Sequence, residues 1–219
     1  MKTAEEVGEY VSLAERAYSI LRDRLVMLEI PPGAPINEGA LATELGIGRT
    51  PIRESLKKLE VDHLVVSYPR RGTFATAVDI KDLASISDVR RALEPLAAAK
   101  AAANAPAAVR KRLLEKAEQI EALDIESMTN RELLEYDLAV HRMIYSAVDN
   151  PHLEEPLVRL DNLVTRIWVM VFDRLPSVGE HVREHSTLLR TIASGDAEEA
   201  ERLVRDHVHN FEMAMRGAL

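Results

Sequence analysis

Three stretches of the sequence place histidine or aspartate on the apolar face of a predicted helix. Asp137 and His141 are four residues apart on the first of these helices, among leucines of the same stripe. His181 and His185 share the stripe of a second helix, and His207 lies on that of a third. Imidazole and carboxylate groups are ligands of zinc, nickel, manganese and iron, so this set predicts a divalent metal site with open coordination positions.

Ordinary core packing is the alternative explanation for each of these histidines. A single inward-facing histidine is usually a core residue that needs only some hydrogen-bond partner. Several of them together with an aspartate, on facing helices, favour a shared ligand set instead. From spacing alone, His181 and His185 compete for the same place, while His209 faces away from the stripe that holds His207.

Arg90 is a further charged residue on an apolar stripe. An unpaired charge in that place would be costly, and two explanations are open. Glu94, one turn later, offers a salt bridge, whereas a pocket for a small anion would use Arg90 to bind that anion.

A second group of residues suits contact with nucleic acid. In GIGRTPIRESLKKL, residues 46–59, Arg49 and Arg53 are one helical turn apart, so both guanidinium groups can reach guanine edges or phosphates. Arg70 and Arg71 fall at the tip of a predicted hairpin and could reach the adjacent backbone. The alternative is a solvated basic helix face, which is the usual meaning of a few charges.

The elements that position these residues follow from periodicity and from breaker residues. Before Val78 the sequence predicts three helices and a hairpin, with Pro51 in the first turn of the third helix and Gly72 in the hairpin turn. After it, breaks divide the chain into about six helical segments. The predicted helices are 12–30, 38–45 and 49–60, the strands lie in 64–68 and 73–78, and the later breaks lie near Pro106, Thr129, Pro151, 176–179 and 195–196.

We therefore expect a mainly α protein with two domains. Residues 1–78 would form a winged helix-turn-helix and residues 79–219 an antiparallel all-α bundle. The alanine-rich run 94–105 is predicted to be a helix that lets a neighbouring helix approach closely.

Composition limits the class of protein. The chain has 219 residues, 47% of them apolar, no cysteine, and a formal net charge of -8. That charge argues against general binding to nucleic acid and leaves the basic patch around Arg49 as the exception. The first ten residues are acidic, and the longest bulky apolar run, 167–172, is too short to span a bilayer, so we expect a cytoplasmic protein without a membrane span.

The region INEGALATELGIGRTPIRESLKKLEVDHLVVSYPRRGTFAT, residues 36–76, resembles the winged helix-turn-helix of the GntR family of bacterial transcription regulators. Three positions depart from the family pattern: Gly39 replaces a larger residue, Gly48 a hydroxyl residue, and His63 a glycine. The resemblance implies DNA contacts from the third helix and from the wing, made by Arg49, Thr50, Arg53, Arg70, Arg71 and Gly72.

The rest of the chain resembles the FadR-type subfamily with its helical FCD domain. The segments that carry this resemblance, in order, are ISDVRRALEPLAAAKAA, EYDLAVHRMIYSAVDNPHL, EHSTLLRTIASGDAEEA and RDHVHNF. It implies one divalent ion, zinc before nickel, manganese or iron, and it favours His185 over His181. The implied ligands are Asp137, His141, His185 and His207.

Together these features predict a homodimeric repressor that binds a palindromic operator in double-stranded DNA. Its effector would be a small carboxylate or sugar acid held between the metal and Arg90. A metalloenzyme with a DNA-binding head is the main alternative, but no general-base motif accompanies the ligands, so we expect no enzyme activity. Two further alternatives are a purely structural metal and a metal-free site for an acyl effector.

Overall fold

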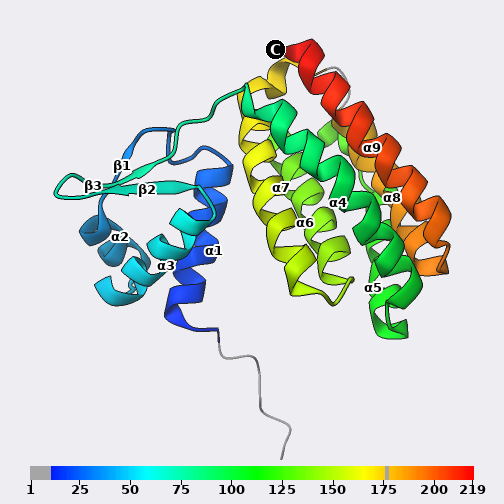
Figure 1. Cartoon of the computed structure of the whole chain (residues 1–219), viewed down its shortest axis with the longest axis horizontal. Coiled ribbons are helices and arrows are strands. Elements are labelled where there is room, and N and C mark those ends of the chain that lie inside the picture. Colours follow the sequence, from blue (N-terminus) through cyan, green and yellow to red (C-terminus); the bar gives the residue numbers. More distant parts are fainter. Residues whose placement is uncertain (1–10, 176–177) are drawn as a thin grey trace, which may run out of the picture. The chain divides into compact units, whose positions relative to one another are not determined.

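The computed structural model describes residues 11–175 and 178–219. The chain divides into two compact units, and the boundary between them falls between Val78 and Asp79 (Figure 1). The first unit combines three helices with a small antiparallel sheet. Its elements are α1 (Leu13–Val26), β1 (Pro35–Ile36), α2 (Glu38–Leu45), α3 (Arg49–Val61), β2 (Val65–Tyr68) and β3 (Gly72–Ala75).

Helix α1 is shorter than its apolar pattern predicts. Ser12 caps its start by accepting a hydrogen bond from the backbone of Glu15, and the helix ends at Val26 instead of Ile30. Leu28 has a φ of 56°, a left-handed conformation that no α-helix contains, and two prolines follow Ile30. The apolar residues after Val26 therefore continue the helical spacing in the sequence, but in the structure they lie in a turn.

The sheet has the order β1-β3-β2, so the predicted hairpin carries a third strand that the sequence pattern does not reveal. β1 is only two residues long, too short for a period of two to be recognised, and it pairs with β3 through Pro35 and Phe74. In the hairpin, Tyr68 lies opposite Gly72, whose φ of 92° confirms its predicted role in the turn. His63, which stands where the family pattern has a glycine, has a φ of 60°, the left-handed conformation that glycine adopts most easily.

Over its described residues the second unit contains six α-helices, in agreement with the predicted breaks, so the mainly α fold class is confirmed. The part of the predicted break that falls on residues 176–177 lies outside the described residues. The helices are α4 (Asp82–Asn104), α5 (Ala107–Glu121), α6 (Asn130–Ser146), α7 (Pro151–Val171), α8 (Val178–Ser194) and α9 (Ala197–Ala218), with single 3-10 turns at Ile125–Ser127 and Phe172–Arg174.

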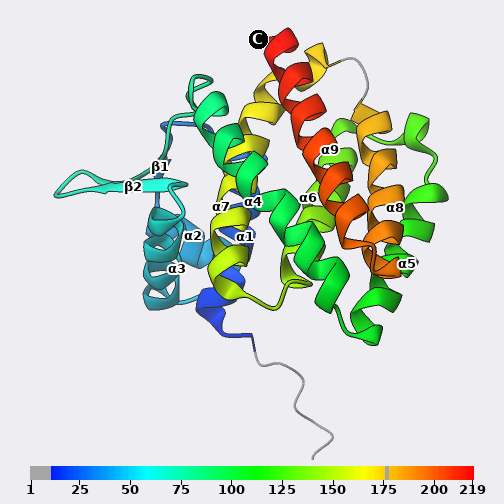
Figure 2. The same cartoon turned by 45° about the vertical axis from the view of Figure 1, so that its right-hand side comes forward.

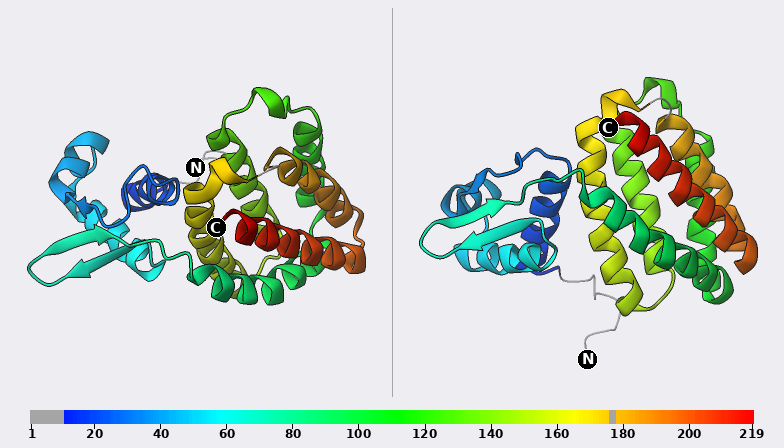
Figure 3. Two further views of the ribbon diagram at one scale, coloured as in Figure 1. Left: turned by 90° about the horizontal axis from the view of Figure 1, so that it is seen from above. Right: turned by 45° about the horizontal axis from the view of Figure 1, so that its top comes forward.

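The helices of this unit pair in a nested order, the first with the last and the second with the second-to-last. α4 packs along α9 and α5 along α8, while α6 and α7 pack on each other and on α4 (Figure 2). Figure 3 shows α9 in red beside α4 in green from two further directions. The alanines of α4 make this approach possible because Ala97, Ala98, Ala101 and Ala102 are completely buried.

Across the described residues, no helix has both the length and the apolar character that crossing a bilayer would require.

Candidate functional site

Five metal-ligating side chains from three helices meet inside the second unit. We call them the His/Asp cluster; each offers one ligand atom, and these atoms all lie within 4.8 Å of one another. α6 supplies Asp137 and His141, α8 supplies His181 and His185, and α9 supplies His207. Spacings of four residues on α6 and α8 place each pair on one face, and apolar burial of those faces brings them together.

Distances within the His/Asp cluster match those between ligands of one ion. The Nε2 atoms of His141 and His185 are 3.4 Å apart, and Asp137 Oδ1 lies 3.3 Å from His181 Nε2 and 3.6 Å from His185 Nε2. Ligands about 2.1 Å from a tetrahedral ion are separated by about 3.4 Å, from the bond lengths that zinc prefers. The cluster could therefore hold a divalent ion with little movement.

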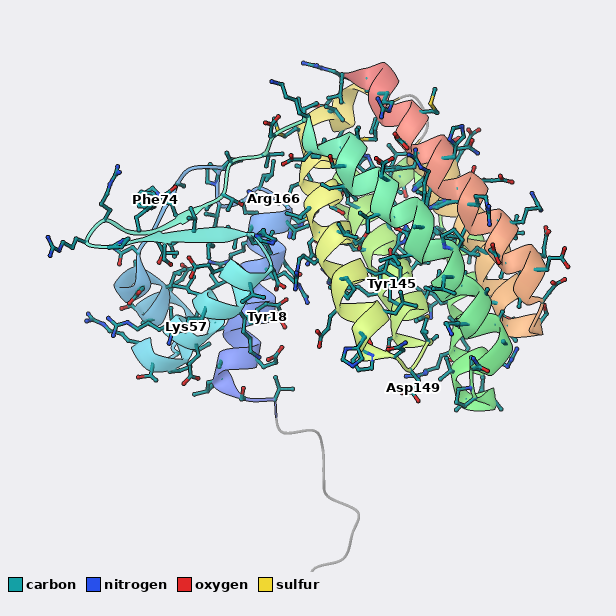
Figure 4. All side chains as sticks on the ribbon, in the orientation of Figure 1. Tyr18, Lys57, Phe74, Tyr145, Asp149 and Arg166 are labelled. Carbon is teal, nitrogen blue, oxygen red and sulfur yellow. The ribbon has the colours of Figure 1, made fainter. Side chains whose placement is uncertain are left out.

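Two of the imidazoles are oriented by groups outside the cluster. The Glu184 carboxylate lies 3.1 Å from His207 Nδ1, and the Tyr145 hydroxyl (labelled in Figure 4) lies 3.1 Å from His141 Nδ1. Each contact is satisfied when the Nδ1 atom carries the proton. The Nε2 atoms of His141 and His207 are then left as bare acceptors, as metal ligation requires.

Several cluster atoms are buried without a protein partner. Among the described residues, neither Asp137 Oδ1 nor His207 Nε2 has a hydrogen-bond partner. Burial lowers the pKa of His185 well below its ordinary value and also lowers the pKa of His207, so both imidazoles are neutral at neutral pH. A metal binds imidazoles in their neutral form and carboxylates in their ionised form, so these groups can act as ligands at neutral pH.

Charges next to the cluster leave an excess of negative charge. Arg90 and Glu94 form a buried salt bridge on α4, and Glu94 also approaches His141 Nδ1 to 3.7 Å. Asp161 on α7 is buried as well, and burial raises its pKa to about 6. Three carboxylates, those of Glu94, Asp137 and Asp161, face one guanidinium, which gives a net charge of -2 when all are ionised. A divalent cation would neutralise it.

Two hollows adjoin the His/Asp cluster. A narrow gap, the inner cavity, is too tight in this arrangement to admit a water molecule; it is lined by Arg90 of α4 and by Asp137 and His141 of α6, with residues of α7 and with His181 and Phe211. An outer pocket of about 120 Å³ lies beside it between α7, α8 and α9. Trp168, His181 and Phe211 line both hollows and so separate them.

The structure thus brings all four predicted ligands and Arg90 to one place, and it adds His181. The salt bridge explanation of Arg90 holds, because its Nε donates to Glu94; the side chain also lines the inner cavity, and its binding of an anion there stays a prediction. Sequence reasoning missed Asp161, Thr165 and Trp168 of α7. Their spacing of four and three residues on one helix face was the available signal.

The predicted DNA-contacting residues are exposed on the first unit. Arg49, Thr50 and Arg53 lie in the first two turns of α3, and Arg53 Nε donates to Glu38 of α2 at 2.7 Å, which ties the two helices together. The Arg53 side chain is still 64% exposed, so its terminal nitrogens are accessible. Gly48 caps α3 without a side-chain hydrogen bond, as expected from the missing hydroxyl.

The wing residues form the exposed tip between β2 and β3. Arg70 has a φ of 63° and Arg71 lies with its guanidinium 5.8 Å from the Tyr68 ring centre. Figure 4 labels Phe74, whose ring packs edge-on against Tyr68 behind the tip, and Lys57 on α3. Two arginines held at a hairpin tip are suited to reach a phosphate backbone.

Comparison with known families assigns both units. Residues 13–75 match the model described as bacterial regulatory proteins, gntR family, and residues 85–210 match the FCD domain. Both matches were expected from the motifs in the sequence.

Relatives with known names cover nearly the whole chain. The HTH-type transcriptional repressor RspR of Escherichia coli K12 is 24% identical over 202 residues, 92% of this chain and 88% of that protein. A probable D-xylose utilization operon transcriptional repressor of Paenarthrobacter nicotinovorans is 29% identical over 196 residues, 87% of this chain and 84% of that protein. The solved structure of E. coli McbR/YncC has the same fold, with a TM-score of 0.73 at 24% identity, covering 94% of this chain and 98% of that one.

Proposed function

Because this chain belongs to the GntR family of bacterial transcription regulators and carries an FCD domain, we propose that it is a metal-containing repressor that responds to a small organic acid. DNA binding and transcription regulation are properties of the family, and its named relatives are regulators, not enzymes. The acid, the metal and the direction of the response are specific to the proposal.

The single observation that carries the proposal is the His/Asp cluster beside Arg90. Asp137, His141, His185 and His207 would hold the ion, with His181 as a fifth donor in reach. Imidazole-rich ligand sets suit zinc first, and nickel, iron or manganese next. A bound ion would supply positive charge and open coordination positions to a site that otherwise carries net negative charge.

An acid effector fits the charge distribution. In the absence of a cation, the buried carboxylates would repel an incoming carboxylate, and with the cation present Arg90 provides a second positive group. We propose that the acid binds between Arg90 and the cluster, which requires the side chains around the inner cavity to move apart, and that it weakens operator binding. Fluorescence anisotropy of DNA from upstream of the gene, titrated with carboxylates before and after chelation, tests this; an effect of acids that survives full metal removal would contradict it.

A purely structural metal is the second candidate, and the position of His181 favours it. Five protein donors within 4.8 Å could fill most of a coordination shell without an effector. In that case chelation should unfold the second unit, and no acid should change the melting temperature of the metal-loaded protein.

We also propose that the second unit forms the dimer. The alanines of α4 are buried within the chain and cannot serve this purpose, but the same helix exposes Val89, Ala92 and Leu96 on one face. Paired heads would then read the two halves of a palindromic operator.

The dimer prediction concerns Leu96, which is 43% exposed. We expect the full chain and residues 79–219 alone to elute as dimers, and Leu96→Glu to shift the full chain toward monomer, because a charge would be buried in the interface. Size-exclusion chromatography with light scattering measures this. Lys111→Glu, at an exposed position on α5, is the control, and a wild-type monomer at micromolar concentration would rule the interface out.

The recognition-helix prediction concerns α3. Arg49→Ala or Arg53→Ala should each weaken operator binding by about 1–3 kcal/mol if the arginine reads a base. Anisotropy with operator and scrambled DNA measures the loss, and Arg112→Ala, an exposed arginine on α5, is the matched control. Unchanged operator affinity in both α3 variants would disprove the assignment.

The wing prediction concerns Arg70 and Arg71. Replacing either with alanine should weaken binding to operator and scrambled DNA about equally and should lower the slope of log affinity against log salt by about 1, as loss of a phosphate contact does. Titrations at several salt concentrations measure both effects. A loss confined to the operator would instead mean that the wing reads bases.

A further inference from the structure

The first turn of α2 lies against the two arginines that α3 would present to DNA. α2 packs on α3, and its first two residues are Glu38 and Gly39. Arg53 Nε donates a hydrogen bond to Glu38 Oε2 at 2.7 Å. The terminal nitrogen Nη2 of Arg49 lies 3.6 Å from the position that a β-carbon on Gly39 would take. Two neighbouring residues of one helix therefore adjoin both arginines of the other.

The bond to Glu38 determines which part of the Arg53 side chain is available to DNA. A guanidinium group has five N–H donors, one on Nε and four on its two terminal nitrogens. Glu38 accepts from Nε, and the Arg53 side chain remains 64% exposed. The two terminal nitrogens therefore keep their parallel N–H groups for the O6 and N7 atoms of a guanine. Without this bond the flexible side chain would reach a phosphate as easily as a base.

Gly39 contributes space instead of a bond. Its backbone is helical, so its conformation does not require glycine, and glycine is a poor helix former. A β-carbon at this position would lie at contact distance from its neighbours, 3.6 Å from Arg49 Nη2 and 3.4 Å from Asn37 Oδ1. Alanine therefore fits, whereas a longer side chain would compete with the Arg49 guanidinium for the same volume.

From these contacts we infer that Glu38 and Gly39 are positioning residues for sequence recognition. Glu38 holds Arg53 in an orientation that reads a base, and Gly39 leaves the space in which the Arg49 guanidinium lies. The inference rests on the recognition-helix assignment made in the proposed function. Each residue acts through an arginine of α3, so its effect depends on the presence of that arginine.

Two variants of Glu38 separate its position from its charge. Fluorescence anisotropy gives the discrimination ratio, the affinity for DNA from upstream of the gene divided by the affinity for a scrambled duplex. Glu38→Ala and Glu38→Gln remove the same negative charge, so both should bind the scrambled duplex more tightly than wild type. Only Glu38→Ala removes the acceptor for Arg53. It should lower the ratio at least about fivefold, the lower end of the effect of one bidentate base contact, whereas Glu38→Gln should keep most of it.

Two variants of Gly39 separate space from stability. Gly39→Ala should keep the discrimination ratio, and Gly39→Leu should lower it at least about fivefold because the leucine displaces the Arg49 guanidinium. Both should raise the melting temperature of the first unit, since alanine and leucine are better helix formers than glycine. A loss of discrimination in a more stable protein excludes unfolding as its cause.

The matched control is Glu44→Ala, at the other end of α2. It removes the same charge and a salt bridge of 2.7 Å between α2 and Arg24 of α1, and it should keep the wild-type ratio. Double variants test whether each residue acts through its arginine. Glu38→Ala/Arg53→Ala should discriminate no worse than Arg53→Ala, and Gly39→Leu/Arg49→Ala no worse than Arg49→Ala.

An unchanged ratio in Glu38→Ala and Gly39→Leu would overturn the inference while leaving α3 as the recognition helix. Equal weakening of both duplexes in Glu38→Ala, or a further loss of discrimination in the double variants, would also overturn it, because the two residues would then serve only the fold. If Arg49→Ala and Arg53→Ala themselves keep the ratio, the recognition-helix assignment fails, and the two failures are thereby distinguished.

Discussion

The double variant His141→Ala/His207→Ala is expected to purify without the divalent ion that wild type should hold at about one per chain. The two substitutions remove donors from two of the three helices and leave Asp137, His181 and His185, too few to retain the ion against a chelator. Elemental analysis after desalting measures the content. Metal at 1000 times its dissociation constant stabilises the folded state by about 4 kcal/mol, so the variant should also lose the shift in melting temperature on metal addition.

Two comparisons make this result specific. His209→Ala, on the exposed side of the same helix as His207, should keep the full metal content. Wild type should lose its ion as the pH falls below about 6, because protons compete for imidazoles whose unfolded-state pKa is about 6.5. Full metal content in the double variant would show that the cluster is not the site.

Replacing Glu94 with alanine is expected to destabilise the second unit by about 3–5 kcal/mol, the cost of leaving a buried charge without its partner. Arg90 is 3% exposed, and Glu94 accepts the hydrogen bond from its Nε. Burial by itself would lower the pKa of Arg90, but Glu94, Tyr145 and Asp161 together raise it, so the guanidinium is charged in folded wild type. In Glu94→Ala this buried charge would lose its main partner. Urea unfolding of the metal-loaded chain, followed by far-UV circular dichroism, measures the loss.

The double replacement Arg90→Met/Glu94→Leu provides the matched control. Exchange of a buried ion pair for apolar residues of similar volume is often nearly neutral, so the double variant should recover most of the stability that Glu94→Ala loses. It should nevertheless fail to bind an acid. Stability of Glu94→Ala equal to wild type would mean that Arg90 finds another partner.

Sequence periodicity was sufficient to place the helices, apart from the end of α1, and to pick out the candidate ligands that lie on their stripes. α2 was predicted with its observed ends, because Asn37 caps its start and Gly46, with a φ of 63°, ends it. Asp137 and His207 were identified because each interrupts an apolar stripe on an otherwise polar helix. Strand β1 was missed because two residues show no period.

The remaining features depend on contacts between helices, which spacing along one helix does not encode. His181 and His185 are one turn apart on the same face of α8. Both lie within reach of Asp137 because α8 packs against α6. Asp161 and Thr165 escaped notice because α7 buries polar and apolar residues on several sides, so no single stripe marks its inner face. The resemblance favoured His185 alone, and the structure brings both histidines into the cluster.

The nested pairing of the helices has a consequence for how the protein is synthesised. α4 is the first helix of its unit to leave the ribosome and α9 the last, so the part of α4 that packs on α9 stays uncovered until α9 has been translated. His207 also arrives with α9, and the incomplete chain therefore lacks both its packing partner and one predicted ligand. We expect the emergence of α9, not that of the earlier helices, to set the moment at which this unit can close, and chains truncated before Ala197 to be substrates for chaperones and proteases.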